Sequence, residues 1–378
     1  MMKIAMLGHK RIPSREGGVE IVVEQLASRM SALGHDVTVY NRKGHHVSGK
    51  ENATFQYEKK FDYKGIHVVT IPTFEKKSLN AIVYSFLAAL HAAFQSYDVV
   101  HFHAEGPCSM IPIAKLFGKR CVATIHGLDW QRSKWGGFAT KFLLFGEKMA
   151  AKYADEIIVL SKNVQNYFKE TYGRDTNYIP NGIDRQEKIS PQIITEKYGL
   201  KGKDYYLFLA RIVPEKGLHY LIDAYKKLDT DKKLVIAGGS SHTDEYMEQI
   251  KASCDENPDI IMTGFVQGQE LQELFSNCYA YVLPSDIEGM PISLLEAMSF
   301  GCNCLVSDIP ENLEVVKDKA FSFKKSDVPS LKEALQKLET LPEEEWLDKG
   351  KAIQKYAEEN FGWDDVTART IKLYESES

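Results

Sequence analysis

The sequence predicts an α/β protein made of two doubly wound domains that face each other across a cleft. Short β-branched runs alternate with helical patterns along the whole 378-residue chain, which is typical of parallel sheets. The chain is long enough for two domains of ordinary size. A turn at Pro180-Asn181-Gly182 separates a first series of these units from a second one. We therefore expect domains at residues 1–185 and 186–362.

The first series predicts one sheet and an amphipathic helix. The strand candidates are Lys3–Gly8, Val37–Asn41, His67–Pro72, Val99–His103, Cys121–His126 and Ile157–Ser161. Val19–Leu33 has apolar residues at helical spacing, so we expect a helix there. The second series gives the strands Tyr205–Ala210, Leu234–Gly238, Ile260–Phe265, Tyr279–Pro284 and Cys304–Ser307. A last helix near Trp363–Tyr374, in the segment 363–378, is a candidate to pack back on the first domain.

Composition is that of a globular chain, with 44% hydrophobic and 11% aromatic residues. No apolar run is long enough for a transmembrane helix, and the apolar start is too short for a signal peptide. The six cysteines have no C-x-x-C spacing, so reduced structural thiols are expected and a metal site is not. These features favour a cytoplasmic protein.

Charge is distributed unevenly along the chain. Residues 1–185 carry a net charge of +8 and the remainder carries −13, which together give the overall −5. A basic first half favours an anionic partner for that half. Nucleic acid is disfavoured because the basic residues are interspersed and no recognition motif is present. An anionic lipid surface or a diphosphate-bearing acceptor fits better.

The most informative segment is Ser285–Glu296, which leads from a strand into a helix that ends at Gly301. Pro291 suits the first helical position, where its missing N–H costs nothing. Glu288 would stand on the loop at the helix start, and Glu296 about one and a half turns along the helix. Backbone N–H groups there favour an anion, and carboxylates accept hydrogen bonds from sugar hydroxyls. The segment fits a nucleotide-sugar, although solvated acidic helix starts are common.

Two further loops extend this candidate site. Arg211 and Lys216 follow the strand Tyr205–Ala210, and such a pair of cations would neutralise a diphosphate. Gly17 and Gly18 precede the first helix, and paired glycines let the backbone approach a phosphate closely. The spacing is not G-x-G-x-x-G, so a nicotinamide or flavin site is disfavoured. Either loop alone would be an ordinary solvated turn.

Histidines stand at neighbouring strand ends in the first half. His101 and His103 end one predicted strand, and His126 ends the next. One histidine at a strand end usually has a structural role. For three at neighbouring strand ends, we consider a functional role and a structural role equally.

Leu79–Phe94 is apolar and follows Lys76 and Lys77. It is either a helix buried against the sheet, which we favour, or a helix that dips into a membrane carrying a lipid-linked acceptor. Cationic and aromatic residues follow it at Lys115, Lys119, Arg120, Arg132, Lys134, Trp135, Lys141 and Phe142. We expect weak, salt-sensitive contact with anionic membranes, at the inner face of the cell membrane.

Taken in order, these motifs resemble a family 4 glycosyltransferase of the GT-B fold, over essentially the whole chain. The matching residues are Gly17-Gly18, His126, Pro180-Asn181-Gly182-Ile183-Asp184, Arg211 with Lys216, and Glu288 with Glu296. The segments Gly8–Glu20 and His126–Gly136 are similar to a bacterial subgroup that includes rhamnosyltransferases of surface-polysaccharide assembly. The resemblance implies two Rossmann-like domains and a retaining transferase. Its donor would be a nucleotide-diphosphate sugar (dTDP-rhamnose or a UDP-sugar), and its saccharide acceptor would be lipid-linked.

The resemblance also implies residue roles, with no metal and no other cofactor. Arg211 and Lys216 would bind the diphosphate, Glu288 the donor-sugar hydroxyls, and Glu296 the ribose hydroxyls. Further donor contacts fall to Gly17, Gly18, Val266, Gly289, Met290, Pro291 and Ile292. His126 would face the donor sugar and the acceptor, so the catalytic set is His126, Arg211, Lys216 and Glu288. The acceptor-side candidates are His103, Asp129 and Arg15.

Other functions remain open on the residues alone. A nucleotide-sugar epimerase or hydrolase would need an added acid/base pair, for which His103 and Glu105 are candidates. A non-catalytic nucleotide-sugar binding protein is the third possibility. The complete set of Arg211, Lys216, Glu288 and Glu296 favours the transferase. Asp286 and Glu288 mimic a metal-binding D-x-D pair, but we expect no metal there.

Overall fold

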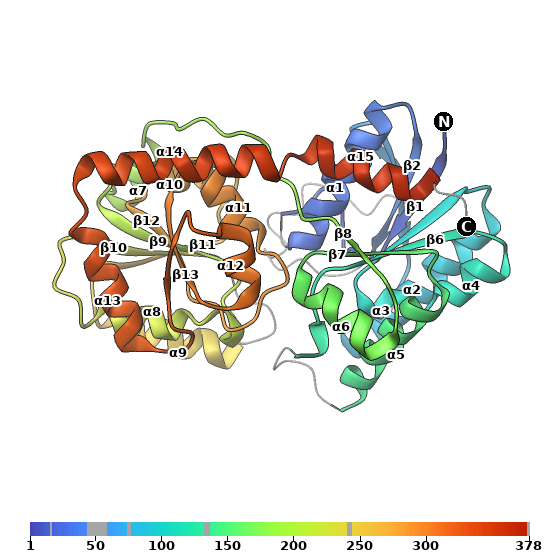
Figure 1. The fold of residues 1–378 in the computed structure, drawn as a ribbon, viewed down its shortest axis with the longest axis horizontal. Coiled ribbons are helices and arrows are strands. Elements are labelled where there is room, and N and C mark those ends of the chain that lie inside the picture. The colour runs from blue at the N-terminus through green and yellow to red at the C-terminus, as the bar shows by residue number, and fades with distance from the viewer. Residues whose placement is uncertain (16, 44–58, 74–76, 132–136, 240–243, 376–378) are drawn as a thin grey trace. The chain divides into compact units, whose positions relative to one another are not determined.

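The computed structural model describes residues 1–378 except 16, 44–58, 74–76, 132–136, 240–243 and 376–378. The chain divides into two compact units, Met1–Gly182 with Trp363–Ser378, and Ile183–Gly362. The division falls at the end of the Pro180-Asn181-Gly182 turn, slightly before the expected boundary at residue 185. Each unit is an α/β fold built on a single sheet (Figure 1). 

The first unit has an eight-stranded sheet in the order β3-β4-β2-β1-β5-β6-β7-β8. Its strands are β1 (Lys3–Leu7), β2 (Asp36–Arg42), β3 (Lys60–Tyr63), β4 (Ile66–Ile71), β5 (Val99–His103), β6 (Arg120–Ile125), β7 (Glu156–Val159) and β8 (Asn177–Tyr178). All neighbours are parallel except β3 and β4 at one edge. The edge strands β3 and β8 were not predicted, because neither is a buried apolar run.

Helices cover both faces of this sheet (Figure 1). On one face α1 (Gly18–Ala32) packs against α15 (Trp363–Glu375). The other face carries α2 (Lys77–Phe94), α3 (Glu105–Cys108), α4 (Ile111–Leu116), α5 (Phe138–Tyr153) and α6 (Lys162–Tyr172). Helix α2 buries Tyr84, Ala88, Ala89 and Ala92 in the core, in line with the favoured interpretation of residues 79–94.

The final helix belongs to the first unit. The Tyr374 hydroxyl lies 2.6 Å from His101 Nδ1, and both Nε and Nη2 of Arg120 donate to the Leu373 carbonyl. At Gly182 a Cβ would lie 2.4 Å from the Trp363 ring, so only glycine admits this packing. The glycine read from the sequence as part of a turn is therefore also a packing site for α15.

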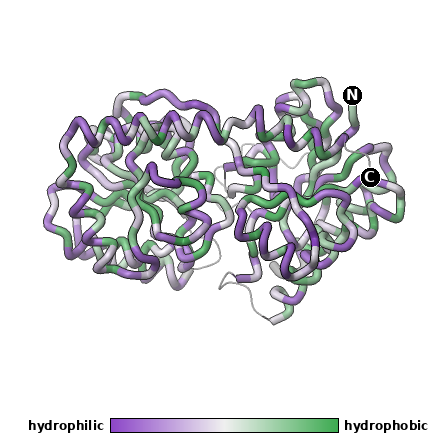
Figure 2. Tube along the Cα trace, viewed as in Figure 1, coloured by the Kyte–Doolittle hydropathy of each residue, from purple (hydrophilic) through white to green (hydrophobic). Residues whose placement is uncertain are grey.

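The second unit has a six-stranded parallel sheet in the order β11-β10-β9-β12-β13-β14. Its strands are β9 (Tyr205–Leu209), β10 (Lys233–Ala237), β11 (Ile260–Gly264), β12 (Ala280–Leu283), β13 (Asn303–Ser307) and β14 (Phe321–Phe323). Its helices are α7 (Ile193–Tyr198), α8 (Leu218–Tyr225), α9 (Asp244–Asp255), α10 (Gly268–Asn277), α11 (Ile292–Ser299), α12 (Pro310–Val316), α13 (Val328–Glu339) and α14 (Glu343–Asn360). Figure 2 shows hydrophobic residues along the inner strands and hydrophilic ones along α14.

Strand order fixes where a ligand site is expected in each unit. In the first unit β1 lies between β2 and β5, and in the second unit β9 lies between β10 and β12. The chain thus turns to opposite sides of β1 and of β9, and open α/β sheets bind ligands at such a switch point, beyond the carboxyl ends of the strands. The loops after β1, β5, β9 and β12 are therefore the first places to look.

Two smaller findings bear on the expectations from composition. Across the described parts of the chain, no helix combines the length and the apolar character needed to span a bilayer. All six cysteines are buried, and none of them is in a disulfide.

Candidate functional site

In the second unit, the loops after β9 and β12 are packed against each other at the switch point. Gly217 has a φ of +66°, and a Cβ there would lie 2.0 Å from the Pro284 carbonyl oxygen. The Asp286 N–H donates to the Glu215 carbonyl oxygen at 2.9 Å. Only a glycine permits so close an approach of the two backbones.

The close packing of these two loops brings together two of the predicted site residues, Lys216 and Glu288. The Lys216 ammonium and Glu288 Oε1 form an ion pair, and the Ser285 hydroxyl donates to the same Oε1 at 2.6 Å. The Lys216 side chain is 13% exposed and that of Glu288 is 6% exposed, so the pair is shielded from water. Both bonds end on Oε1, and among the described residues Oε2 carries none.

Residues that sequence reasoning missed hold this pair in place. Ser307 Oγ donates to the Ser285 carbonyl oxygen, and Asn312 Nδ2 donates to Ser307 Oγ at 3.1 Å. Asp286 accepts hydrogen bonds from Tyr220 at 3.2 Å and from Ser326 at 2.6 Å. Asp286 therefore anchors its loop. No spacing rule in the sequence could have linked Ser307 or Ser326 to this site, because Ser307 ends β13 and Ser326 follows β14.

Helix α11 begins one residue later than the sequence suggested. Pro291 is the N-cap residue, with φ −74° and ψ 114°, and not the first helical residue. Extended backbone at Pro291 allows its carbonyl to accept from the amides of Leu294 and Leu295. Because proline has no N–H, Pro291 supplies no amide donor at this helix start, and the residues around it that carry one are Gly289, Met290, Ile292 and Ser293. Glu296 lies half-buried one turn further along.

The other predicted donor residues lie on neighbouring loops of the same sheet edge. Arg211 is half-buried on the loop after β9. At Gly238, where φ is +145°, a Cβ would lie 1.9 Å from the Ala210 carbonyl oxygen, so the loop after β10 packs on that loop. Val266 is 8% exposed and follows β11, the edge strand. All of these residues therefore lie beyond the carboxyl ends of the strands. Val266 is farthest from the switch point, because it follows the edge strand β11.

In the first unit, three histidines gather near the switch point, as the strand ends predicted. His103 Nδ1 lies 3.1 Å from His126 Nε2, and the His101 and His103 rings are 4.1 Å apart. His101 Nε2 also lies 2.7 Å from the Thr124 hydroxyl. Burial lowers the pKa of His101 to about 3 and that of His103 well below its usual value. Both rings are therefore neutral at physiological pH.

Glu105, a candidate with His103 for an acid/base pair, instead lies buried with a second carboxyl group, Glu147, which was not predicted. Glu147 Oε1 accepts from the hydroxyls of Tyr167 and Tyr172 at 2.7 and 2.6 Å. Burial first, and then the nearby carboxylates of Asp129 and Glu147, hold the pKa of Glu105 well above its usual range. Glu105 is therefore uncharged at neutral pH, and a buried neutral carboxyl is a poor general base for the epimerase or hydrolase alternative.

The remaining predicted residues of the first unit occupy the loops after β1 and β6. Gly17 is the N-cap of α1, and a Cβ there would lie 2.2 Å from Glu20 Oε2, whose partner oxygen accepts from the Lys10 N–H. Gly18 and Arg15 are exposed, and Asp129 is half-buried on the short 3-10 turn Asp129–Gln131. Arg132, Lys134, Trp135 and Lys76 lie outside the described residues.

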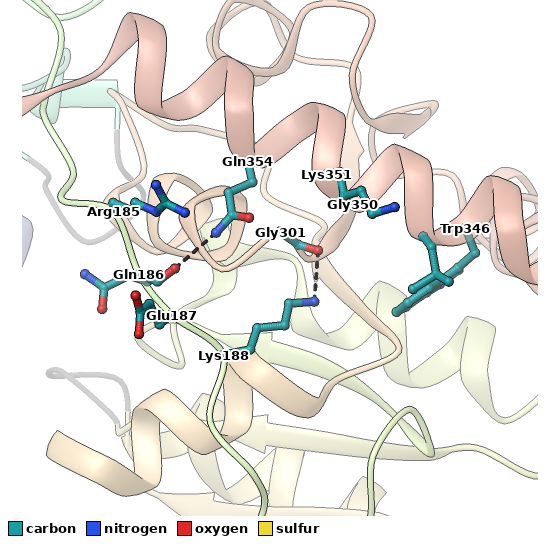
Figure 3. A pocket seen from close by; sticks show the side chains of 10 residues that line it. Arg185, Gln186, Glu187, Lys188, Gly301, Trp346, Gly350, Lys351 and Gln354 are labelled. Atoms are coloured by element: carbon teal, nitrogen blue, oxygen red, sulfur yellow. Dashed lines mark hydrogen bonds between the residues drawn. The ribbon is translucent and has the colours of Figure 1, made fainter.

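A separate cavity of about 360 Å³ lies in the second unit, between the chain segment 185–188 and helix α14 (Figure 3). Lys188 Nζ donates to the Gly301 carbonyl oxygen at 3.4 Å, and Gln354 Nε2 donates to the Gln186 carbonyl oxygen at 3.1 Å. Gly301 precedes β13, so the cavity lies near the amino ends of the strands, whereas Ser285 lies beyond the carboxyl end of β12. None of the predicted site residues lines it.

Comparison with known proteins identifies the architecture. Residues 16–187 match the model of the family described as Glycosyltransferase Family 4, and residues 192–360 match that of Glycosyl transferases group 1. Sucrose-phosphate synthase from Thermosynechococcus elongatus superposes with a TM-score of 0.82 at 18% identity, covering 99% of this chain and 98% of that one. Anabaena Alr3699/HepE in complex with UDP and glucose gives 0.81 at 16% identity, covering 98% and 99%.

A curated relative adds a named activity. The UDP-Gal:alpha-D-GlcNAc-diphosphoundecaprenol alpha-1,3-galactosyltransferase of Escherichia coli is 29% identical over 259 residues, or 64% of this chain. The match spans 66% of the length of that relative. Together the two family matches cover most of both units, with the ion pair and the loops after β5, β9 and β12 inside them. The chain is a family 4 glycosyltransferase of the GT-B fold.

Proposed function

We propose that the protein transfers a hexose or deoxyhexose from a nucleotide-diphosphate donor to a saccharide acceptor, with retention of anomeric configuration and without a bound metal. The observation that carries the proposal is the ion pair of Lys216 and Glu288 at the switch point of the second sheet. It sets a cation for phosphate beside a carboxylate for sugar hydroxyls, which is the combination that a nucleotide-sugar requires.

The two members of the pair can serve the donor without separating. An ammonium has three N–H donors, so Lys216 can bond a phosphate oxygen while it keeps Glu288 Oε1. Glu288 Oε2 then remains to accept from a hydroxyl of the donor sugar. Ser285, by donating to Oε1, keeps the carboxylate in one rotamer. The pair would thus fix the sugar relative to its diphosphate.

Negative charge builds on the phosphates as the nucleoside diphosphate departs. Arg211, Lys216 and the amides of Gly289, Met290 and Ile292 would stabilise that charge in the transition state. One well-placed donor of this type contributes about 3 kcal/mol, or roughly a hundredfold in rate. The acceptor hydroxyl would attack from the leaving-group side, and its proton would pass to the departing phosphate oxygen. No protein nucleophile is required, because the acceptor hydroxyl itself attacks and the departing phosphate takes its proton.

The first unit is proposed to handle the acceptor, with His126 as the group that faces the sugars. Its neighbour His103 is neutral and buried, so it can fix the ring of His126 through one hydrogen bond but cannot add charge. By analogy with the curated relative, whose name gives a diphosphoundecaprenol-linked acceptor, we propose a lipid-linked saccharide met at the anionic inner face of the cell membrane. Surface-polysaccharide assembly is the process this would serve.

The experiment compares donor consumption with and without acceptor, over a panel of UDP- and dTDP-sugars. A transferase consumes donor only when acceptor is present, a hydrolase consumes it alone, and a binding protein consumes none. The anomeric configuration of the product, read by NMR, tests retention. Transfer in the presence of a strong chelator tests metal independence, and loss of activity that added Mg²⁺ restores would refute that part.

A further inference from the structure

The outer surface of the first unit carries aromatic and cationic side chains in one stripe along α5. Phe138, Lys141, Phe145, Lys148 and Lys152 follow one another at intervals of three or four residues, which places them on one side of the helix. Phe138 is 72% exposed and Phe145 49% exposed, and all three lysines are exposed. The opposite side of α5 is buried, and at Gly146 a Cβ would lie 2.0 Å from the Glu105 carbonyl oxygen.

The stripe continues onto the ends of α4 and α2. Leu116 is 84% exposed, Phe117 45% and Phe94 67%. The rings of Phe94 and Phe117 are 4.7 Å apart, in an edge-to-face arrangement. Lys115, at the end of α4, pairs with Asp155 just after α5 at 2.8 Å, so these helix ends lie together. All three helices are on the side of the sheet away from α1 and α15 (Figure 1).

The described side chains of α2, α4 and α5 present no exposed negative charge. The sequences of α2, α4 and α5 contain a single acidic residue, Glu147, and its side chain is buried. The exposed charges of α5 are therefore all positive. A symmetric contact between two copies would set these lysines against each other, which is unfavourable. An anionic surface that also accepts aromatic and aliphatic groups fits both features.

We propose that the face formed by Phe94, Leu116, Phe117, Phe138 and Phe145 with Lys141, Lys148 and Lys152 docks on an anionic lipid bilayer. The aromatic rings would enter the headgroup boundary while the lysines contact lipid phosphates. The proposal differs from the sequence-based idea that Leu79–Phe94 dips into a membrane, because one side of that helix packs in the core and only its last residue, Phe94, joins the proposed face. It rests on the proposed function in one respect: a lipid-linked acceptor explains why the protein would bind a membrane.

Vesicle flotation tests the proposal with the full-length protein and no sugar substrate. The wild type should float with vesicles that contain phosphatidylglycerol at low ionic strength, and should not float with pure phosphatidylcholine vesicles. Lys141→Glu/Lys148→Glu should weaken binding by at least about tenfold, since each of the two basic residues contributes roughly fivefold near the surface. Phe138→Ser/Phe145→Ser should weaken it by about tenfold through lost insertion.

Matched controls separate this face from general charge or apolarity. Lys227→Glu/Lys337→Glu changes two exposed lysines of the second unit, and Leu33→Ser changes a 65% exposed residue at the end of α1. These controls should bind as the wild type does. The proposal is overturned if the wild type fails to float, if the face variants float like the controls, or if the face variants alter oligomeric state, which would mark a contact between copies.

A parallel assay separates this proposal from the proposed function. Transfer to a water-soluble acceptor should be the same in the face variants and the wild type. Vesicle binding without any transfer would sink the proposed function and leave the docking face standing. Transfer without vesicle binding would overturn the docking face and leave the proposed transferase activity standing.

Discussion

Lys216 and Glu288 form a shielded ion pair that joins the loop after β9 to the loop after β12, although the two residues are 72 positions apart in the chain. The pair lies at the switch point of a parallel sheet. Because β9 and β12 are parallel neighbours, the loops that follow them leave the sheet at the same ends of the strands. The same side chains therefore hold the two loops together and, in the proposed function, bind the donor. This double role makes its substitutions informative.

Breaking the pair should cost stability as well as activity. Glu288→Gln removes the charged carboxylate that faces the shielded Lys216 ammonium, and loss of one partner of a buried ion pair costs about 3 kcal/mol. Urea unfolding of Glu288→Gln, Lys216→Met and the double variant should show that the double variant loses less than the sum of the single ones. Strictly additive losses would mean that the two side chains do not interact.

Gly217→Ala should separate the two loops. A Cβ at this position would lie 2.0 Å from the Pro284 carbonyl oxygen, and the residue also has a positive φ. We expect a loss of about 2 kcal/mol or more in the free energy of unfolding, together with loss of transfer. Gly202→Ala is the matched control, because its Cβ would meet only Asn277 at 3.9 Å. Equal stability of the two variants would contradict the close approach of the loops.

Stability should fall in mild acid because of buried neutral histidines in the first unit. Burial lowers the pKa of His101 from 6.5 to about 3 and that of His9 from 6.5 to about 4. The unfolded chain therefore binds protons before the folded one does, so this stability is complete above pH 6.5 and is lost as pH falls towards 4. The slope is about 1.4 kcal/mol per pH unit for each histidine.

His101→Gln should flatten that slope by about one histidine's share. The measurement is the free energy of unfolding in urea at several pH values between 7 and 5. Leu33→Ser, which changes no titratable group at a 65% exposed position, should leave the slope unchanged. An identical slope in His101→Gln and the wild type would show that His101 protonates equally in the folded and unfolded chains.

Tyr374→Phe should loosen the final helix from the first unit. The variant removes the hydroxyl that lies 2.6 Å from His101 Nδ1 and leaves that buried nitrogen without its partner. We expect a loss of about 1–3 kcal/mol, seen as a lower thermal midpoint. Tyr153→Phe, at an exposed position of α5, serves as the control. A thermal midpoint for Tyr374→Phe equal to that of the wild type would count against this contact.

The sequence predicted the strands well because each is a short apolar run that the sheet buries. It missed β3, β8 and β14, which lie at sheet edges and carry mixed residues. It also placed Arg211, Lys216, Glu288 and Glu296 on the correct loops and helix. It could not show that Lys216 pairs with Glu288, because that contact depends on the order of strands in the sheet. The start of α11 was misplaced by one residue, because Pro291 has the extended backbone of an N-cap and not that of a first helical residue.

Buried polar contacts were the least predictable part of the site. Ser307, Asn312 and Ser326 support the Glu288 loop from elements that follow it in the chain. Glu105 and Glu147 look like ordinary charged residues in sequence, and only their burial shows that Glu105 is uncharged. Each of these contacts arises from tertiary packing, which carries no local signature.

The most direct test of the central claim is the affinity of a nucleoside diphosphate, UDP or dTDP, for the wild type, Arg211→Ala, Lys216→Ala and the remote control Lys227→Ala, measured by calorimetry. Gripping of the diphosphate by the loops after β9 and β12 predicts that both site variants lose about tenfold or more in affinity while the control keeps that of the wild type. Undiminished binding by Arg211→Ala and Lys216→Ala, in protein shown to be folded, would contradict the account.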